Sequence, residues 1–543
     1  MKNLYTTLFI LGLFAVTFSC TDLEEDLRGV ITTNISVQGI ATDTGGGAGA
    51  DALEGAFSQL RNTGTGGHTN WYSAQELTSD EMVVTTKGGD WYDGGWLIDF
   101  HKHQYKSTNP SVNNNWNSHY GAVNACNELL SGGSLDANGT AQIRALRAYF
   151  FWRLMDLYGN IQLPTAPGAS VAQSTRAEAF AFIESELLAA LGDSDLSDGV
   201  DLTSSALGTA KDAYRLNQFG VLGIIAKLYL GAEVYLESAP GALDGTPHFN
   251  EAAAAAQYII DNGGYALCAA GCKGANPGKR PDVDDDPAEL EGFPHVFAPN
   301  NQGNVEHIWT VKYDAATAGG FNLAMMALHY SSQLTWNFDS QPWNGYSSLE
   351  AFYNSFAEPA PTGHDPRRDW SFIEGPQLDF GGNALLDYAT DDGDPILVYT
   401  PFINEIYPDG CRECGVRPGK FSYSQFGRSS MDNDFTLIRL GQVHLIRGEA
   451  LARAAGDWSL ALDDVNALRN RVGLSPLAAM DADTFLKERG KEMFSEAVRR
   501  TDLIRFGKYG DTWWEKPASD GNKTIFPIPY DRIQEGLTQN PGY

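Results

Sequence analysis

Apolar residues recur at spacings of three and four along several long segments of this chain, as they do on the buried face of a helix. Between 141 and 158 this face carries Ile143, Leu146 and Phe150, and Gly159 ends the pattern. The same periodicity predicts further helices over 175–191, 216–236, 250–260, 435–455, 458–471 and 481–506.

Start signals support two of these helices. Thr175 is followed three residues later by Glu178, the spacing of a capping box, in which each side chain bonds the backbone N–H of the other residue. Asn250 precedes the alanines of 252–256, and an asparagine at that place predicts an N-cap. Both signals place a helix start where the apolar pattern begins.

Two helix pairs share a pattern of small residues. Tyr229-Leu-Gly-Ala-Glu233 precedes the alanines of 252–256, and Ile446-Arg-Gly-Glu-Ala450 precedes a helix that contains Ala461. Small side chains at facing positions let two helices approach closely, and the pattern resembles the units of tetratricopeptide repeats at an irregular period. Residues 265–430 differ, because they are rich in Gly, Pro, Asn, Asp and aromatic residues. A loop-rich region within a helical scaffold usually carries the ligand site.

The composition is that of a folded protein whose charge disfavours polyanionic partners. The chain has 543 residues, 43% of them hydrophobic. This length exceeds the roughly 250–300 residues at which single cores stop growing, and it favours a large domain with a second lobe. The net charge is −30. Nucleic acids and anionic lipid surfaces both attract clusters of Lys and Arg, so this charge excludes nucleic acid and disfavours an anionic membrane surface.

The first residues have the order of an export signal. Lys2 precedes an apolar run that is shorter than the ~20 residues of a membrane-spanning helix, and Ser19-Cys20 follows this run. The order resembles a bacterial lipoprotein signal. Residues 1–19 are therefore predicted to be removed, Cys20 to carry lipid, and 20–50 to form a polar leader. An ordinary secretory signal that is cleaved nearby is the alternative.

The acidic residues that follow Cys20 give a second export signal. Residues 21–26 resemble the signal that sends lipoproteins of Bacteroidota to the outer face of the outer membrane. No later segment has 18 uninterrupted apolar residues, so the lipid is the expected membrane anchor.

Cysteine spacing leaves several pairings open. Cys268 and Cys272 form one close pair and Cys411 and Cys414 another, both in Gly-rich segments. In an exported protein they are expected to form two small disulfide clips or to pair across, and a zinc site of four thiolates is the alternative. Cys126 lies in an apolar helix and is interpreted as a buried free thiol.

Two loops combine aromatic rings with polar side chains. The first follows Asp80 and contains Trp91, Tyr92, Asp93 and Trp96 among glycines that cannot bury the rings locally. Sugar rings present apolar C–H faces that stack on aromatic rings, while carboxylates and amides bond sugar hydroxyls. The alternative is that these rings pack onto the helices and fix a long loop in place.

The second loop has the same chemistry and the same alternative. It contains Trp336, Trp343 and Asn344, with Pro342 and Gly345 to stiffen and turn the chain. We expect the two loops to line one groove for an extended glycan. The candidate ligand-binding residues are Asp80, Trp91, Tyr92, Asp93, Trp96, Trp336, Trp343 and Asn344.

Metal and catalytic signals are weak in comparison. His101 and His103 have a spacing that zinc uses, but no further ligand is grouped with them. The acidic residues Asp282–Asp286 could hold a structural calcium ion, although they lack the EF-hand spacing, and a solvated loop is the alternative. No cofactor or catalytic residue is assigned, because none of the short catalytic motifs occurs. The charged run 487–505 has its charges three or four residues apart and is interpreted as structural.

Several of these segments together carry a family likeness. The run from Arg144 to Ile161 resembles the first signature helix of the SusD/RagB-type outer-membrane lipoproteins of Bacteroidota. Further segments match the same family in order, namely 439–450, 466–473, 488–505 and 526–543.

The resemblance implies a mostly α fold, in which about four tetratricopeptide-like helix pairs form a right-handed scaffold with an irregular, loop-rich ligand-binding lobe. It implies one SusD-like domain over 51–543, with the scaffold mainly at 121–262 and 435–506 and the insertion at 265–430. It also implies a lipid-anchored, surface-facing location on the outer membrane and a TonB-dependent transporter of the SusC type as partner.

The same resemblance implies capture of an oligosaccharide or polysaccharide without catalysis. A marine β-glucan such as laminarin is one candidate ligand, because strong acidity is common in proteins that work in salt, but the sequence does not name the sugar. The alternatives are peptide binding, since some relatives bind peptides, and a surface glycoside hydrolase.

Overall fold

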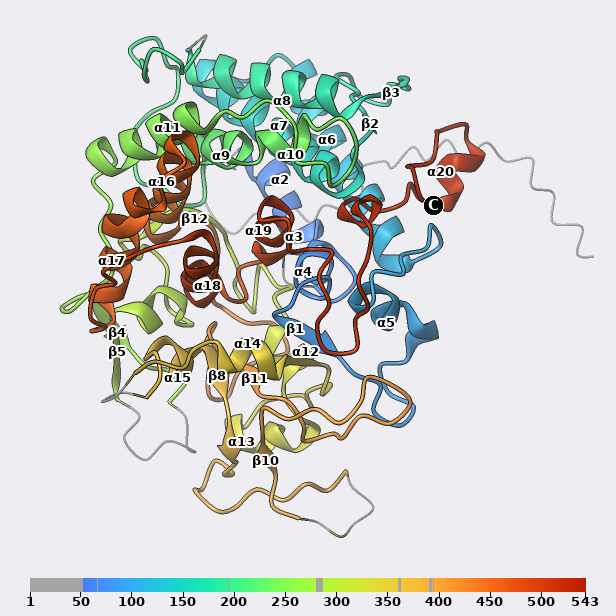
Figure 1. The fold of residues 1–543 in the computed structure, drawn as a ribbon, viewed down its shortest axis with the longest axis vertical. Coiled ribbons are helices and arrows are strands. Elements are labelled where there is room, and N and C mark those ends of the chain that lie inside the picture. Colours follow the sequence, from blue (N-terminus) through green and yellow to red (C-terminus); the bar gives the residue numbers. More distant parts are fainter. Residues whose placement is uncertain are drawn as a thin grey trace, which may run out of the picture. The chain divides into compact units, whose positions relative to one another are not determined.

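Most long helices form where the apolar periodicity predicted them, and helices make up most of the regular structure (Figure 1); the helix over 110–131 was not predicted. The computed structural model describes residues 52–65, 67–193, 195–279, 287–359, 363–389, 393 and 395–543, which all lie in one compact unit. Cys20, the leader 20–50 and the acidic segment Asp282–Asp286 lie outside the described residues.

The longer helices lie in two stretches of the sequence, 110–262 and 440–493. They are α6 (Pro110–Ser131), α7 (Ala137–Tyr158), α8 (Arg176–Leu191), α9 (Gln218–Leu230), α11 (Phe249–Asn262), α16 (Leu440–Ala455), α17 (Leu462–Arg471) and α18 (Ala482–Met493). Side-chain caps begin most of them. Thr175 and Glu178 form the predicted capping box of α8, and Asn217 caps α9 by accepting a bond from the backbone N–H of Gly220.

Shorter elements fill the rest of the described chain. The short α-helices are α2 (Glu54–Phe57), α3 (Gln59–Asn62), α4 (Trp71–Glu76), α5 (Trp96–His101), α10 (Ala232–Tyr235), α12 (Leu323–Ala327), α13 (Gln333–Trp336), α14 (Glu350–Asn354), α15 (Arg367–Ser371), α19 (Arg499–Arg505) and α20 (Tyr530–Gln534). The 3-10 turns are η1 (Asp93–Gly95), η2 (Phe293–Phe297), η3 (Tyr330–Ser332), η4 (Trp458–Ala461) and η5 (Gly521–Thr524).

The strands are short and pair two at a time, always antiparallel. They are β1 (Met82–Val84) with β7 (Tyr346–Ser348), β2 (Ile161–Gln162) with β3 (Gln173–Ser174), β4 (Lys273–Ala275) with β5 (Glu289–Glu291), β6 (His307–Val311) with β12 (Phe435–Arg439), β8 (Phe372–Ile373) with β11 (Arg417–Pro418), and β9 (Gly375–Pro376) with β10 (Val398–Tyr399).

Neighbouring long helices pack against one another. α7 contacts α6 and α8, and α11 contacts α9 and α16, so that the green and orange helices of Figure 1 lie side by side. Small residues permit this approach. A Cβ on Gly448 of α16 would lie 3.3 Å from Ala461, and one on Gly223 of α9 would lie 2.8 Å from the side chain of Ile438. The tetratricopeptide-like, right-handed arrangement of these pairs and the domain boundaries stay predictions.

Three predicted helix boundaries are wrong. Asn250 does not cap α11, which starts one residue earlier, after His248. The ring of His248 stacks on that of Tyr229, with 5.1 Å between centroids, and this tertiary contact fixes the helix start. The segment 435–455 begins as strand β12, because its first five residues pair with β6 across the chain.

The third error concerns 481–506, which is broken between α18 and α19. Ser495 and Ala497 have left-handed backbone angles there, with φ of 63° and 57°. Their backbone N–H groups donate to the buried carboxylates of Glu81 (3.3 Å) and Glu76 (2.7 Å). These long-range bonds replace helical ones, and no Gly or Pro in the sequence marks the break.

The charged run 487–505 is structural, as predicted; some of its ion pairs are local, but many of its partners are distant in sequence. The buried carboxylate of Glu492 contacts three arginines, with N–O distances of 3.0 Å to Arg367, 2.8 Å to Arg439 and 2.7 Å to Arg471. These arginines come from α15, β12 and α17. We call Glu492 and its three arginines the Glu492 cluster; it joins the C-terminal helices to the loop-rich segment before them.

Glu496 extends the Glu492 cluster. Its carboxylate contacts Arg439 at 2.7 Å and Lys420 at 2.6 Å, and both partners are almost fully buried. Burial alone would raise the pKa of Glu496, but the two cations lower this pKa to about 2. Glu496 is therefore ionised inside the protein, and its charge holds β12 and the turn at Lys420 together.

The cysteines form the two local disulfides that the sequence allowed. Cys268 bonds Cys272, and Cys411 bonds Cys414. Pairing across and a four-thiolate zinc site are therefore wrong for these residues. Cys126 is a buried free thiol, as predicted, and burial raises its pKa to about 12. Within the described ranges, every helix is either too short or too polar to cross a bilayer.

We predict that Glu492→Gln destabilises the protein by about 3–5 kcal/mol, because it leaves three buried guanidinium groups short of one negative charge. Urea unfolding followed by circular dichroism measures this loss. The matched control is Glu535→Gln, which weakens an exposed ion pair with Arg532 and is expected to cost less than ~1 kcal/mol. Equal effects of the two substitutions would show that the Glu492 cluster is not a stabilising centre.

Candidate functional site

An open cavity of about 390 Å³ lies where the two predicted aromatic loops meet. Trp91 comes from the first loop and Trp343 from the second, 252 residues away in sequence. Both rings are partly exposed. The other lining residues are His68, Asp90, Asp93, Tyr330, Gln341 and Pro342. The sequence-based expectation that these loops line one groove therefore holds for Trp91, Asp93 and Trp343.

Trp91 is held in place by contacts to the second loop. Its indole Nε1–H donates to the backbone carbonyl of Trp343 at 2.5 Å, and its ring lies against Gly345. A Cβ at position 345 would lie 2.5 Å from that ring, so only glycine leaves room for it. The ring of His68 approaches both tryptophans edge-on, at centroid distances of 5.7 and 5.9 Å.

The second loop is fixed by backbone hydrogen bonds. Residues 343–345 donate their N–H groups to carbonyls of Met325, Leu328 and Met326 at 2.6–2.8 Å. Because α12 is buried, these bonds attach the loop to the core. Two short strands complete the frame, since β1 precedes the first loop and β7 follows the second, and they pair directly.

Lys87 joins the two loops from beneath. Its side chain is buried, and its Nζ donates to the carbonyl of Gly345 at 3.1 Å. Burial, together with the nearby charges of Arg417 and Arg412, lowers the pKa of Lys87 well below its ordinary value. Lys87 therefore positions the loops, and its ammonium group does not line the cavity.

Polar groups at the cavity have defined partners. The hydroxyl of Tyr330 donates to the carboxylate of Asp90, and the amide of Gln341 donates to the hydroxyl of Tyr388 at 2.8 Å. Burial lowers the pKa of His68, and the charge of Asp93 only partly opposes this, so the imidazole is neutral at pH 7. The cavity thus presents carboxylates, an amide and a neutral imidazole.

Non-glycine residues with left-handed backbone gather here. Trp91, Asp93 and Asn344 have φ of 63°, 44° and 57°. Such conformations cost on the order of 1 kcal/mol each and are typical of functional sites, where the surrounding contacts enforce them.

Two predicted tryptophans are wrong as stacking surfaces. Trp96 is only 6% exposed and packs edge-on against Phe100, at 5.5 Å between centroids. Trp336 is 1% exposed and packs against Tyr423 at 5.5 Å. Each begins or ends a short helix whose apolar side faces the core, so neither presents a ring face to a ligand.

Two predicted polar residues are also structural. Asp80 makes a bidentate ion pair with Arg499, with N–O distances of 2.7 and 2.9 Å. Asn344 is fully buried, and its Oδ1 accepts a bond from Arg417 at 2.8 Å. Both side chains bond internal partners, and neither lines the cavity.

Tyr92 lies beside the cavity rather than in its lining. It is 44% exposed, and its ring meets that of Tyr407, which is also exposed, at a centroid distance of 5.4 Å. Ligand contact by Tyr92, Trp91, Asp93 or Trp343 stays a prediction.

Sequence reasoning missed His68, Asp90, Tyr330, Gln341 and Pro342 as lining residues. Asp90, Gln341 and Pro342 are sequence neighbours of the tryptophans, so proximity in the loops was a usable signal. His68 and Tyr330 belong to other segments, and only the tertiary fold brings them to the cavity.

A buried carboxyl pair supports the start of the first loop. Glu76 and Glu81 are both fully buried next to β1, and each carboxyl group influences the pKa of the other. Burial raises the pKa of Glu76 to about 7. Burial and the Glu76 charge raise that of Glu81 well above its ordinary value, although Arg499 opposes this. The two carboxyl groups therefore keep their protons to a higher pH than exposed carboxyl groups do.

Metal binding has little support in the described part of the chain. Two groups of close ligand-type side chains there each contain a disulfide, Cys268–Cys272 or Cys411–Cys414. A third group consists of Glu358, Asp365 and Glu488, which are already paired with Arg367, Arg469 and Lys491. His101 and His103 bond the backbone carbonyls of Trp514 and Thr78 instead.

Comparisons with known proteins agree with this architecture. Residues 305–543 match the model of the SusD family. The starch-binding protein SusD of Bacteroides thetaiotaomicron is 32% identical over 124 residues, which cover 21% of this chain and only 22% of that protein.

Solved structures extend the likeness to nearly the whole fold. A laminarin-binding SusD-like protein is 22% identical, with a TM-score of 0.64 over 91% of this chain and 98% of its own. Surface glycan-binding protein A from Bacteroides thetaiotaomicron in complex with laminarihexaose is 17% identical. Its TM-score is 0.66, and the match covers 90% of this chain and 98% of that protein.

Residues 305–543 thus match the SusD family model, and the described chain has the mostly helical fold of SusD-like structures. The resemblance stated from the sequence motifs is confirmed.

We predict a pH-dependent loss of stability from the Glu76–Glu81 pair. A pKa that is higher in the folded than in the unfolded chain adds stability at low pH, and this stability is lost as pH rises from about 4.5 through about 7. The glutamine of Glu81→Gln cannot ionise. Between pH 5 and pH 8 the free energy of unfolding of this variant should therefore fall less than that of the wild type, by on the order of 2 kcal/mol. Urea unfolding across this pH range measures the difference, and parallel curves for the two proteins would refute the assignment.

Proposed function

We propose that this protein captures neutral glycans in the cavity between Trp91 and Trp343 and does not transform them. The observation that carries the proposal is the meeting of two tryptophans from distant segments at one open cavity that also presents Asp90, Asp93 and Gln341. Ring faces stack on sugar C–H groups, and the carboxylates and amide bond sugar hydroxyls.

The charge of the cavity favours neutral sugars. Its lining residues include two carboxylates, Asp90 and Asp93, and neither lysine nor arginine is among them. The side chain of His68 is neutral at pH 7. Uronic acids and sulfated sugars would be repelled by these carboxylates and by the net charge of −30.

A β-glucan of the laminarin type is the ligand that we favour. Two structural neighbours are described as a laminarin-binding protein and as a complex with laminarihexaose. At 22% and 17% identity they support the fold directly and the ligand only by analogy. Each exposed ring contributes on the order of 1 kcal/mol, so micromolar to millimolar affinity is expected.

We propose that captured glycan passes to an outer-membrane transporter of the SusC type. The lipid expected on Cys20 would hold the protein at the cell surface, facing outward. Weak binding suits this role, because a protein that delivers its cargo must release it. Peptide capture by the same cavity is the alternative ligand class, and the aromatic lining alone does not distinguish the two.

We predict that Trp343→Ala weakens binding of a laminarin oligosaccharide by about 5- to 10-fold, the effect of one lost stacking surface. Isothermal titration calorimetry against a panel of neutral glycans, acidic glycans and peptides measures it. The matched control is Trp370→Ala, a partly exposed tryptophan at a different cavity, which should bind as the wild type does.

Two results would contradict the proposal. Unchanged binding by Trp343→Ala with loss in Trp370→Ala would place the site elsewhere. Binding of peptides and of no glycan would establish the other ligand class.

We also predict that no sugar chain is cleaved. Asp90→Asn and Asp93→Asn should each weaken binding, and neither they nor the wild type should release reducing ends from the polysaccharide during prolonged incubation. Enzymatic hydrolysis of a glycosidic bond needs a pair of carboxyl groups that act together, and Asp90 and Asp93 are the carboxyl groups that line this cavity. Turnover by the wild type that one of these substitutions abolishes would establish an enzyme.

A further inference from the structure

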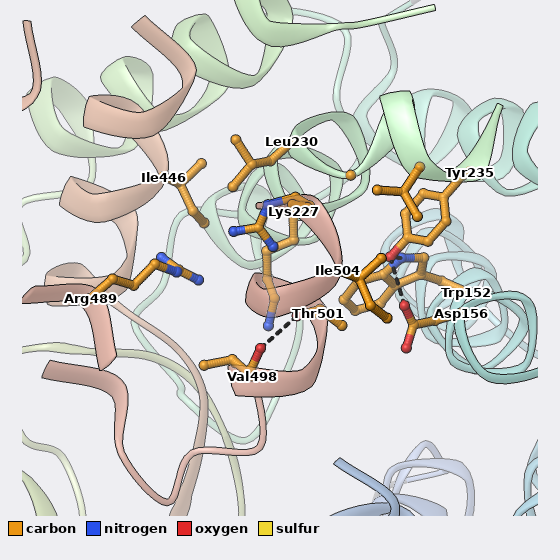
Figure 2. A pocket seen from close by; sticks show the side chains of 13 residues that line it. Trp152, Asp156, Lys227, Leu230, Tyr235, Ile446, Arg489, Val498, Thr501 and Ile504 are labelled. Atoms are coloured by element: carbon orange, nitrogen blue, oxygen red, sulfur yellow. Dashed lines mark hydrogen bonds between the residues drawn. The ribbon is translucent and has the colours of Figure 1, made fainter. Parts of the chain in front are cut away.

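A second cavity lies inside the helical scaffold, far in sequence from the aromatic loops. It has a volume of about 30 Å³ and is lined by side chains of α7, α9, α10, α16, α18 and α19 (Figure 2). This space holds one small ion or one or two water molecules. It is not sealed, because Lys227 at its wall keeps some exposed surface.

Positively charged donors face this cavity without enough partners. Lys227 donates to the backbone carbonyl of Leu437 at 3.2 Å and forms no ion pair with any carboxylate of the described residues. Arg489 is 3% exposed; its Nε pairs with Asp502 at 2.8 Å, while its Nη1 is buried without a partner. Figure 2 shows the guanidinium group of Arg489 pointing toward the ammonium group of Lys227.

The nearby carboxylates already pair with other side chains. Asp156 lines the opposite end of the cavity, where its Oδ2 pairs with Arg500 at 2.8 Å and its Oδ1 accepts from Tyr235 at 3.1 Å. Asp502 and Glu449 both pair with Arg505, another lining residue, at 2.8 Å. The ammonium group of Lys227 therefore forms no direct ion pair at the cavity, because each of these carboxylates is bonded to another side chain.

Burial and the neighbouring arginines make this imbalance costly. Burial first, and then the charges of Arg153 and Arg489, lower the pKa of Lys227 to about 7, although Asp502 and Glu496 oppose them. An anion in the cavity would offset this cost, because opposite charges at short range favour the charged lysine.

We propose that this cavity binds a small monovalent anion, chloride in physiological solution, between the ammonium group of Lys227 and Nη1 of Arg489. The volume is large enough for a halide ion. Bound there, the anion joins α9 to α18 and stabilises the scaffold. The proposal does not depend on glycan binding.

Two measurements test the site. In crystals of the full chain grown with sodium bromide, anomalous diffraction should show a bromide peak between Lys227 and Arg489. At constant ionic strength, replacing gluconate by chloride should raise the melting temperature by about 2 °C once chloride is ~20-fold above its dissociation constant.

Variants assign the effect to the cavity. Lys227→Met should lose the chloride dependence, whereas Lys487→Met, which removes an exposed lysine of α18, should keep it. A chloride effect that persists in Lys227→Met would overturn the proposal. If Lys227→Met does not fold, the bromide experiment on the wild type decides alone, and absence of the peak in the cavity refutes the site.

Discussion

The buried carboxylate of Glu492 is the constraint on which the rest of the architecture depends. It forms ion pairs with Arg367, Arg439 and Arg471, which three different elements contribute. Burying such charges is costly unless all of them are paired, so these elements have one mutual arrangement that satisfies every group. Glu306 carries the network further, because it pairs with Arg439 and Arg471 and accepts the backbone N–H of Cys268. A single ionic centre thus joins the helical scaffold to loops that have little regular structure of their own.

The ligand cavity also depends on contacts between segments that are distant in sequence. The break between α18 and α19 directs two backbone N–H groups at Glu76 and Glu81, and this anchors the chain just before β1. The pairing of β1 with β7 then brings the first aromatic loop to the second. Gly345 leaves the space that the ring of Trp91 fills. The cavity is therefore a product of contacts between segments that lie hundreds of residues apart.

Local patterns in the sequence explain what could be predicted. Helix periodicity and the capping box at Thr175 depend on neighbours along the chain, and they were correct within a few residues for most long helices. The two aromatic loops were also recognisable from composition. Composition did not show which ring is exposed, because Trp91 lines the cavity whereas Trp96, five residues later, is buried in the core. The predicted ligand contacts of Asp80 and Asn344 were wrong for the same reason, because their partners Arg499 and Arg417 are distant in sequence.

The central claim is that a sugar ring occupies the space between Trp91 and Trp343. The most direct measurement is a crystal structure of the protein with a laminarin oligosaccharide. The account predicts glycan density against these two rings, with hydroxyl groups bonded to Asp90, Asp93 or Gln341. Density at another surface, or an empty cavity at ligand concentrations that saturate binding in solution, would contradict it.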